Sequence, residues 1–139
     1  MVILIQETLG ENYTLGDFIR HVAAVLTKEN NGFPYSDDTS WHKMLLDIRN
    51  EYPGLEPFKS VTFVFDDSTY PTCTKMSEFL EALHWSGALS VENPAYKTAK
   101  VKSDLADMWE KELNEQSPQY RKIVEEGVKK LIEYSKSDK

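Results

Sequence analysis

The 139-residue chain contains few side chains whose types could do chemistry: three histidines, one cysteine and two pairs of adjacent aspartates. Asp17 and His21 stand four positions apart, a spacing that puts two side chains on one face of a helix. Such a pair could offer two metal ligands or a carboxylate that orients an imidazole. The histidines lack the paired-His or Cys/His spacing of a zinc site. We therefore expect Asp17 and His21 to form an exposed polar pair.

The adjacent aspartates at 37–38 and 66–67 could supply oxygen ligands to a hard cation. Neither pair is followed by the central glycine and terminal glutamate of an EF-hand loop. Aspartates are also favoured before helices and in turns, where they accept hydrogen bonds from the backbone. We expect both pairs to serve as helix caps and turn residues.

Cys73 stands just before a predicted helix, a place where the helix dipole can lower the pKa of a thiol. A nucleophile also needs a base, and His84 lies roughly 16 Å farther along the same helix at 1.5 Å per residue. A catalytic cysteine is therefore disfavoured.

Because this cysteine is the only one, no internal disulfide is available, and a reducing cytoplasm is the expected location of the protein.

Sequence motifs of the common enzyme classes are missing: we find no G-x-S-x-G, no P-loop and no G-x-G-x-x-G. The sequence assigns no catalytic, cofactor-binding or metal-binding residue, and we expect no cofactor. A small hydrolase or metal-dependent enzyme that uses Asp17, His21 or the acidic pairs is the least favoured of three functions considered.

Lysines are the residues that favour nucleic acid as a partner. The candidate DNA contacts are Lys75, Lys97, Lys100 and Lys102. The formal net charge of −7 opposes binding to a phosphate backbone, and residues 1–70 carry eleven acidic against five basic side chains. Glu78 and Glu81 would also point outward from the same predicted helix as Lys75. We therefore expect Lys97, Lys100 and Lys102 to lie on a solvent-exposed hairpin rather than to contact DNA.

Five helices are predicted from apolar residues at three- and four-residue spacing. The first runs from about 15 to 28, with Thr14 as its N-cap, and the second covers 41–48. The third carries Met76 to Leu83, is capped by Thr72 or Thr74, and ends at Gly87. The fourth and fifth begin at Ser103 and at Ser117-Pro118.

Extended structure is predicted where apolar and polar residues alternate at 61–65, and in two short segments, 88–92 and 95–101, around Asn93-Pro94. A helix followed at once by such a hairpin resembles the second half of a winged helix-turn-helix. The likeness concerns architecture alone and transfers no functional residues. We therefore predict an α+β fold, predominantly helical, with a winged-helix-like unit in the middle to C-terminal half.

The chain is predicted to form one domain over residues 1–139, because this length is typical of single domains. Residues 103–139 form a helical pair that packs on the core or on a second subunit. The apolar stripe of this pair suggests a homodimer. Trp85 is expected to pack under the hairpin, with exposure to a partner as the alternative. The candidate partner contacts are Trp85, Trp109, Leu113, Tyr120, Ile123 and Leu131.

Composition narrows the class of protein. Hydrophobic residues make up 40% of the chain and charged residues 28%, which excludes a disordered chain. The longest apolar run, Met1–Ile5, is too short to cross a bilayer, so we expect no membrane partner.

The favoured function is a small, non-enzymatic cytoplasmic module that regulates through protein contacts. The alternative is a winged-helix transcriptional or antitoxin-like regulator that contacts DNA.

Overall fold

The structure, a computed structural model, describes residues 14–30, 32–35, 39–52, 58, 63, 73–90 and 98–137. Most of these residues lie in five helices, and a small three-stranded antiparallel sheet accompanies them. The helices are α2 (Leu15–Asn30), α3 (Thr39–Glu51), α5 (Thr74–Trp85), α6 (Ser103–Asn114) and α7 (Pro118–Ser137). The strands are β1 (Phe33–Pro34), β2 (Leu89–Ser90) and β3 (Thr98–Val101). This composition agrees with the predicted helix-dominated α+β class.

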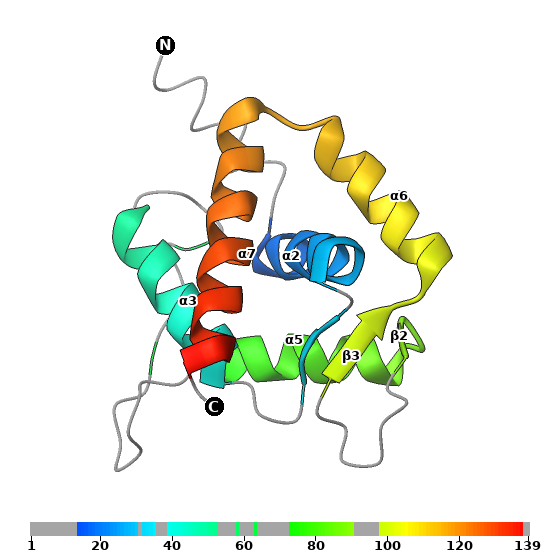
Figure 1. Cartoon of the computed structure of the whole chain (residues 1–139), viewed down its shortest axis with the longest axis horizontal. Coiled ribbons are helices and arrows are strands. Elements are labelled where there is room, and N and C mark those ends of the chain that lie inside the picture. Colours follow the sequence, from blue (N-terminus) through cyan, green and yellow to red (C-terminus); the bar gives the residue numbers. More distant parts are fainter. Residues whose placement is uncertain are drawn as a thin grey trace.

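Helix α2 lies at the centre of the molecule, with α3, α5, α6 and α7 around it (Figure 1). The residues from His21 to Leu26 are all buried, so this stretch is covered on every side. Ala23 and Ala24 contribute to this arrangement, because small side chains let neighbouring elements approach the backbone closely. The sequence predicted one buried stripe. The surrounding helices cover the rest.

Helix α2 begins with the N-cap that the sequence predicted. The Asp17 N–H donates to Oγ1 of Thr14 at 3.1 Å, and the Thr14 N–H donates to Oδ2 of Asp17 at 3.1 Å. These reciprocal bonds form a capping box, which satisfies two donors at the helix start. At the other end Gly32, with a φ of 128°, follows the helix in a conformation that favours glycine.

Helix α5 differs at its start from the expectation and agrees with it at its end. Cys73 occupies the N-cap position and makes no side-chain capping bond, while Thr74 is already helical. After the helix, the N–H groups of Gly87 and Ala88 donate to the carbonyls of His84 and Leu83 at 3.0 and 3.1 Å. This is a Schellman motif with a φ of 84° at Gly87.

The sheet has the order β1-β3-β2 with antiparallel neighbours, so the predicted hairpin is confirmed in its described part. Strand β1 was not predicted from the sequence. It pairs with β3, with Phe33 opposite Ala99. Proline is tolerated here because β1 is an edge strand. The predicted strand 61–65 lies outside the described residues except for Phe63, which is not in a strand.

Helices α6 and α7 start as the sequence predicted and pack within the same chain, α6 on α2 and α7 on both α2 and α3. Ser117 caps α7 by accepting from the Tyr120 N–H at 3.2 Å, and Pro118 takes the first helical position. Helix α7 continues as far as Ser137. Among the described helices, none is long and apolar enough to span a membrane.

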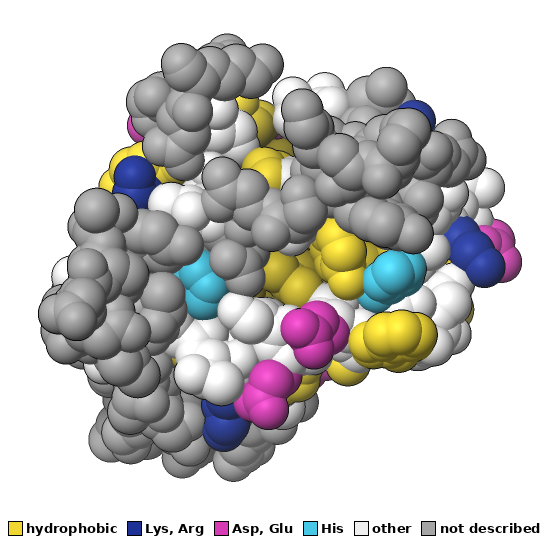
Figure 2. All heavy atoms as spheres, turned by 90° about the horizontal axis from the view of Figure 1, so that it is seen from below, with side chains coloured by type: hydrophobic (Ala, Val, Ile, Leu, Met, Phe, Trp, Pro, Cys, Tyr) yellow, Lys and Arg dark blue, Asp and Glu magenta, His cyan; other side chains and the backbone are white. Residues whose placement is uncertain are grey.

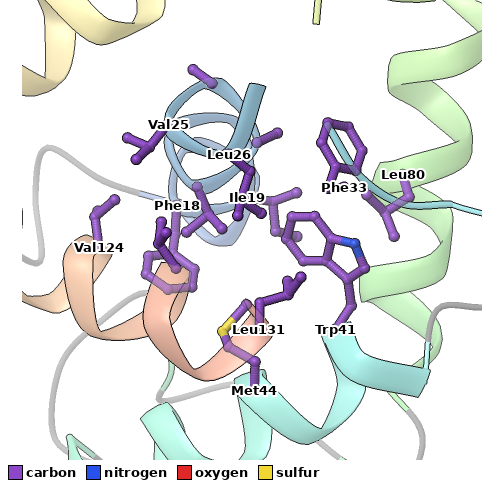
Figure 3. Close-up of a cluster of buried hydrophobic side chains, with 14 of the residues drawn as sticks. Phe18, Ile19, Val25, Leu26, Phe33, Trp41, Met44, Leu80, Val124 and Leu131 are labelled. Atoms are coloured by element: carbon purple, nitrogen blue, oxygen red, sulfur yellow. The ribbon is translucent and has the colours of Figure 1, made fainter. Parts of the chain in front are cut away.

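The hydrophobic core joins these elements around α2. Trp41 of α3 lies between Phe33, Leu80 and α2, while Val124 and Leu131 come from α7 (Figure 3). The Trp41 indole N–H donates to the Pro34 carbonyl oxygen at 2.9 Å, and its ring meets Phe33 edge-on at 5.6 Å. A buried indole usually needs such a hydrogen-bond partner. Trp41 therefore holds β1 against the core.

Candidate functional site

A polar cluster containing His21 joins α2 to α6 and α7. His21 is only 2% exposed, so this polar side chain is as buried as the apolar Phe18 and Val22 near it in α2. Its Nδ1 lies 2.7 Å from the Tyr120 hydroxyl, and its Nε2 lies 3.1 Å from Oε1 of Glu112. The expectation of an exposed Asp17–His21 pair is therefore wrong for His21. The imidazole is enclosed because α6 and α7 cover the side of α2 that the sequence pattern left open.

The hydrogen bonds fix the proton arrangement of this cluster. Because a carboxylate accepts hydrogen bonds, Nε2 of His21 carries the proton that it donates to Glu112. Nδ1 then accepts from the Tyr120 hydroxyl. Burial lowers the pKa of His21, and the hydrogen bond that it donates to Glu112 opposes this shift without cancelling it. His21 is thus a neutral imidazole near pH 7, with both ring nitrogens engaged.

Arg20 extends the cluster toward the surface. Its guanidinium forms ion pairs with Asp17 and, at 3.4 Å, with Glu112, and it lies 5.2 Å from the centre of the Trp109 ring. Burial raises the pKa of Asp17. The hydrogen bonds from Arg20 and from the Thr14 backbone lower this pKa by more than burial raises it, so the net shift is downward. The carboxylates of Asp17 and Glu112 are therefore both paired with Arg20 of the same chain.

A second buried histidine, His42, holds the start of α5. The backbone N–H of Cys73 donates to Nδ1 of His42 at 3.0 Å. The proton of this imidazole is therefore on Nε2, which lies 3.3 Å from Oγ of Ser77. Because Nδ1 already accepts a bond, it is unavailable as a base for the buried thiol of Cys73. This contact is not visible in the sequence, because His42 of α3 and Cys73 are 31 positions apart and meet only in the folded chain.

Aromatic side chains meet on the surface at the end of α5. Trp85 is 82% exposed, so the expectation that it packs under the hairpin is wrong. Its indole stacks on His84 at 5.7 Å with an interplanar angle of 26°. Nδ1 of His84 in turn forms a hydrogen bond with the Tyr35 hydroxyl, at 2.9 Å. Helical periodicity could have shown this, because Trp85 follows the buried Met76 by nine residues, or about two and a half turns, and so faces the opposite side of the helix.

Both basic and acidic side chains are exposed on and around α5. Lys75 is exposed near the start of α5, Glu78 and Glu81 are exposed along its middle, and Lys100 and Lys102 are exposed on and after β3. A Cβ at Gly87 would stand 4.0 Å from Nζ of Lys102, which places this ammonium group beside the end of α5. Figure 2 shows acidic, histidine and hydrophobic side chains gathered on this face. Lys97 lies outside the described residues.

Five of the six candidate partner contacts are buried within the single chain. They are Trp109, Leu113, Tyr120, Ile123 and Leu131. Helices α6 and α7 direct these side chains at α2 and α3, so their apolar stripe is already covered. The reason given for a two-fold interface through them therefore does not hold, and Trp85 alone of the six is exposed.

Metal ligands do not converge anywhere in the part of the chain that the structure describes, where no group of three His, Cys, Asp or Glu side chains could hold an ion. The aspartate pairs at 37–38 and 66–67 lie outside the described residues.

Hollows on the described surface include two that lie beside α2. The first, of about 340 Å³, lies between the end of α2 and the α6–α7 connection, and is lined by side chains of both charges such as Glu29, Arg121 and Glu125. The second is a groove of about 400 Å³ between the first turns of α2 and the last turns of α5. Phe79, Ala82, Leu83 and Ser86 line it on the α5 side.

Comparison of the chain with protein-family models, with curated proteins and with solved structures found no match.

Proposed function

We propose that this protein is a non-enzymatic regulatory module that docks a protein partner through the exposed face of α5. The observation that carries the proposal is Trp85, which is 82% exposed and stacked on His84. Tryptophan is enriched among the residues that dominate binding energy at protein interfaces. Because the indole is already stacked, it loses little conformational freedom when a partner covers it.

The internal use of the histidines also supports a binding role. His21 and His42 are buried, and each uses both ring nitrogens in hydrogen bonds to its own chain. A general base must reach a proton on its substrate. These imidazoles instead join helices that are distant in sequence. His84, the third histidine, supports the Trp85 ring.

We further propose that α2 through β3 form a winged-helix-like unit. The order helix, strand, two helices and hairpin supports this, as does a sheet in which the first strand pairs with the last. In such a unit α5 takes the place of the recognition helix. Its exposed Glu78 and Glu81 favour a protein over a nucleic acid as the partner, because they would repel phosphates. A reducing cytoplasm suits the single Cys73.

DNA binding is the second candidate function. The proposed winged-helix order favours it, together with the exposed Lys75, Lys100 and Lys102. These lysines stand at the two ends of the α5 face and would contact phosphates rather than base edges.

Photo-cross-linking in cells of the native host tests the protein-docking function. A photoreactive phenylalanine derivative is placed at position 85 and, as a control, at position 108, because Met108 of α6 is also exposed. We expect position 85 to give a discrete protein adduct and position 108 to give none. An adduct at twice the mass of the chain would identify a second copy. Equal yields at the two positions, or no adduct at position 85, would overturn the proposed function.

A further inference from the structure

The hollow at the end of α2 is bounded by three helices that are distant in sequence. Val25 and Glu29 of α2 line it together with residues from the end of α6 and the N-terminal part of α7. From their connection, α6 and α7 pass on two sides of α2 (Figure 1). The volume of the hollow, about 340 Å³, lies at the lower end of the roughly 300–1,000 Å³ typical of ligand pockets. The hollow therefore suits a small molecule.

Four charged side chains line this hollow but form no ion pair in the described part of the chain. They are Glu29, Arg121, Lys122 and Glu125. A fifth, Glu110, is already paired with Lys28 at 3.7 Å. The unpaired charges are two acids and two bases, so they balance. A ligand that carries one charge of each sign would match this lining, whereas a polyanion would be repelled by both unpaired glutamates.

Arg121 supplies the strongest signal for a ligand. Its Nε is buried and has no hydrogen-bond partner in the described part of the chain. A buried donor without an acceptor destabilises the state that contains it. The residue as a whole is only half-buried, so its guanidinium can turn toward a bound carboxylate. A carboxylate accepts two parallel hydrogen bonds from this planar group, which would satisfy the orphaned donor.

Apolar groups complete the lining. Val25, Leu113 and Pro118 contribute aliphatic side chains to the same hollow. Val25 and Leu113 are 8% and 5% exposed, so they belong to the edge of the core rather than to the open surface. An aliphatic group of a ligand that packs against them leaves water, which favours binding.

From this combination we infer that the hollow binds a free α-amino acid with an aliphatic side chain, of which leucine is the representative. The carboxylate of the ligand pairs with Arg121, and its ammonium group is attracted by Glu29 and Glu125. The aliphatic side chain packs against the apolar part of the lining. No described residue of α5 lines the hollow, so this inference goes beyond docking at Trp85 and does not depend on it.

Calorimetric titration of the full chain with L-leucine tests the inference. Two analogues serve as controls, because 4-methylpentanoate lacks the amino group and 3-methylbutylamine lacks the carboxylate. We expect leucine to bind with a dissociation constant of about 0.1–1 mM and each analogue to bind at least about tenfold more weakly, since each loses one charged contact. Amide NMR shifts locate the site, and the largest changes should fall at the hollow rather than along α5.

Matched substitutions on α7 separate the role of Arg121 from a general effect of charge. Arg121→Met removes the guanidinium but keeps an unbranched apolar stem, and Lys129→Met removes the same charge from an exposed position outside the hollow. Arg121→Met should weaken leucine at least about tenfold, while Lys129→Met leaves its affinity unchanged. Because Arg121→Met also removes a buried donor without an acceptor, urea denaturation should show no loss of stability.

Substitution of the glutamates tests the ammonium contact. Glu29→Gln/Glu125→Gln should weaken the binding of leucine but not of 4-methylpentanoate, because only leucine carries the ammonium group. Glu78→Gln/Glu133→Gln makes the same change of net charge at two exposed positions elsewhere and should leave both affinities unchanged.

The inference is overturned if leucine shows no saturable binding up to about 10 mM, if either analogue binds as tightly as leucine, or if Arg121→Met and Lys129→Met behave alike. Shift changes confined to α5 would also contradict it, because the ligand would then occupy the groove beside that helix. Loss of leucine binding in Arg121→Met, with stability retained, supports it.

Discussion

The hydroxyl of Tyr120 lies 2.7 Å from Nδ1 of His21, although the two residues are 99 positions apart in the chain. Their rings also meet edge-on at 5.5 Å. Together with the bond from His21 to Glu112, this contact fastens the central helix α2 to both C-terminal helices. Polar groups in a core specify one arrangement, because each alternative packing would leave a buried donor or acceptor without a partner.

Removal of the Tyr120 hydroxyl is expected to destabilise the protein. In Tyr120→Phe the ring still fills its site, but Nδ1 of His21 loses its donor in a buried position. The free energy of unfolding should fall by about 1–3 kcal/mol, as measured by urea denaturation. Tyr52→Phe is the control, because the Tyr52 hydroxyl bonds to Glu126 in a part-buried position and should matter less. An unchanged stability of Tyr120→Phe would contradict the role given to this hydrogen bond.

Stability should fall in mild acid because of His21. Burial lowers the pKa of His21 in the folded state, whereas in the unfolded chain it titrates near about 6.5. The unfolded state therefore binds more protons between the two pKa values, so stability decreases as the pH falls through about 6.5 toward the lower folded value. Urea midpoints at several pH values measure this slope. His21→Gln should flatten it, while Met108→Ala, which changes no titratable group, should leave it in place.

Gly87 is expected to tolerate substitution poorly for a backbone reason alone. A Cβ there would meet only Nζ of Lys102, at 4.0 Å, so there is room for a side chain. The φ of 84° is the obstacle, and alanine in the left-handed region costs about 1–2 kcal/mol. Thermal unfolding should show Gly87→Ala less stable than the original and Gly87→Asn between them. Equal stabilities would mean that the Schellman motif forms without glycine.

Duplex DNA should bind weakly if protein docking is the function. With a net charge of −7 and two glutamates exposed on α5, the dissociation constant near 0.15 M salt should exceed roughly 10⁻⁵ M. Three or four lysine–phosphate contacts would give a salt slope of only about −3. A titration at two salt concentrations compares the original with Lys75→Glu/Lys100→Glu/Lys102→Glu. Submicromolar binding that these substitutions abolish would establish the DNA-binding candidate instead.

Local patterns in the sequence were sufficient for the helices and several of their ends. Spacing of apolar residues identifies a helix from contacts within one or two turns. The Thr14 and Ser117 caps and the glycine after α5 act over three to five residues, so they too are visible in the sequence. The hairpin of β2 and β3 was predictable for the same reason.

Tertiary structure alone decided the environment of the candidate site residues. Strand β1 exists because β3, more than sixty residues later, supplies its hydrogen-bond partner. His21 is buried because α6 and α7 cover it, and its partners Glu112 and Tyr120 follow it by 91 and 99 positions. Trp85 is exposed although β2 contacts the same helix. A sequence records which side chains one helix can present, but burial depends on which distant elements reach each face, and those contacts exist only in the folded chain.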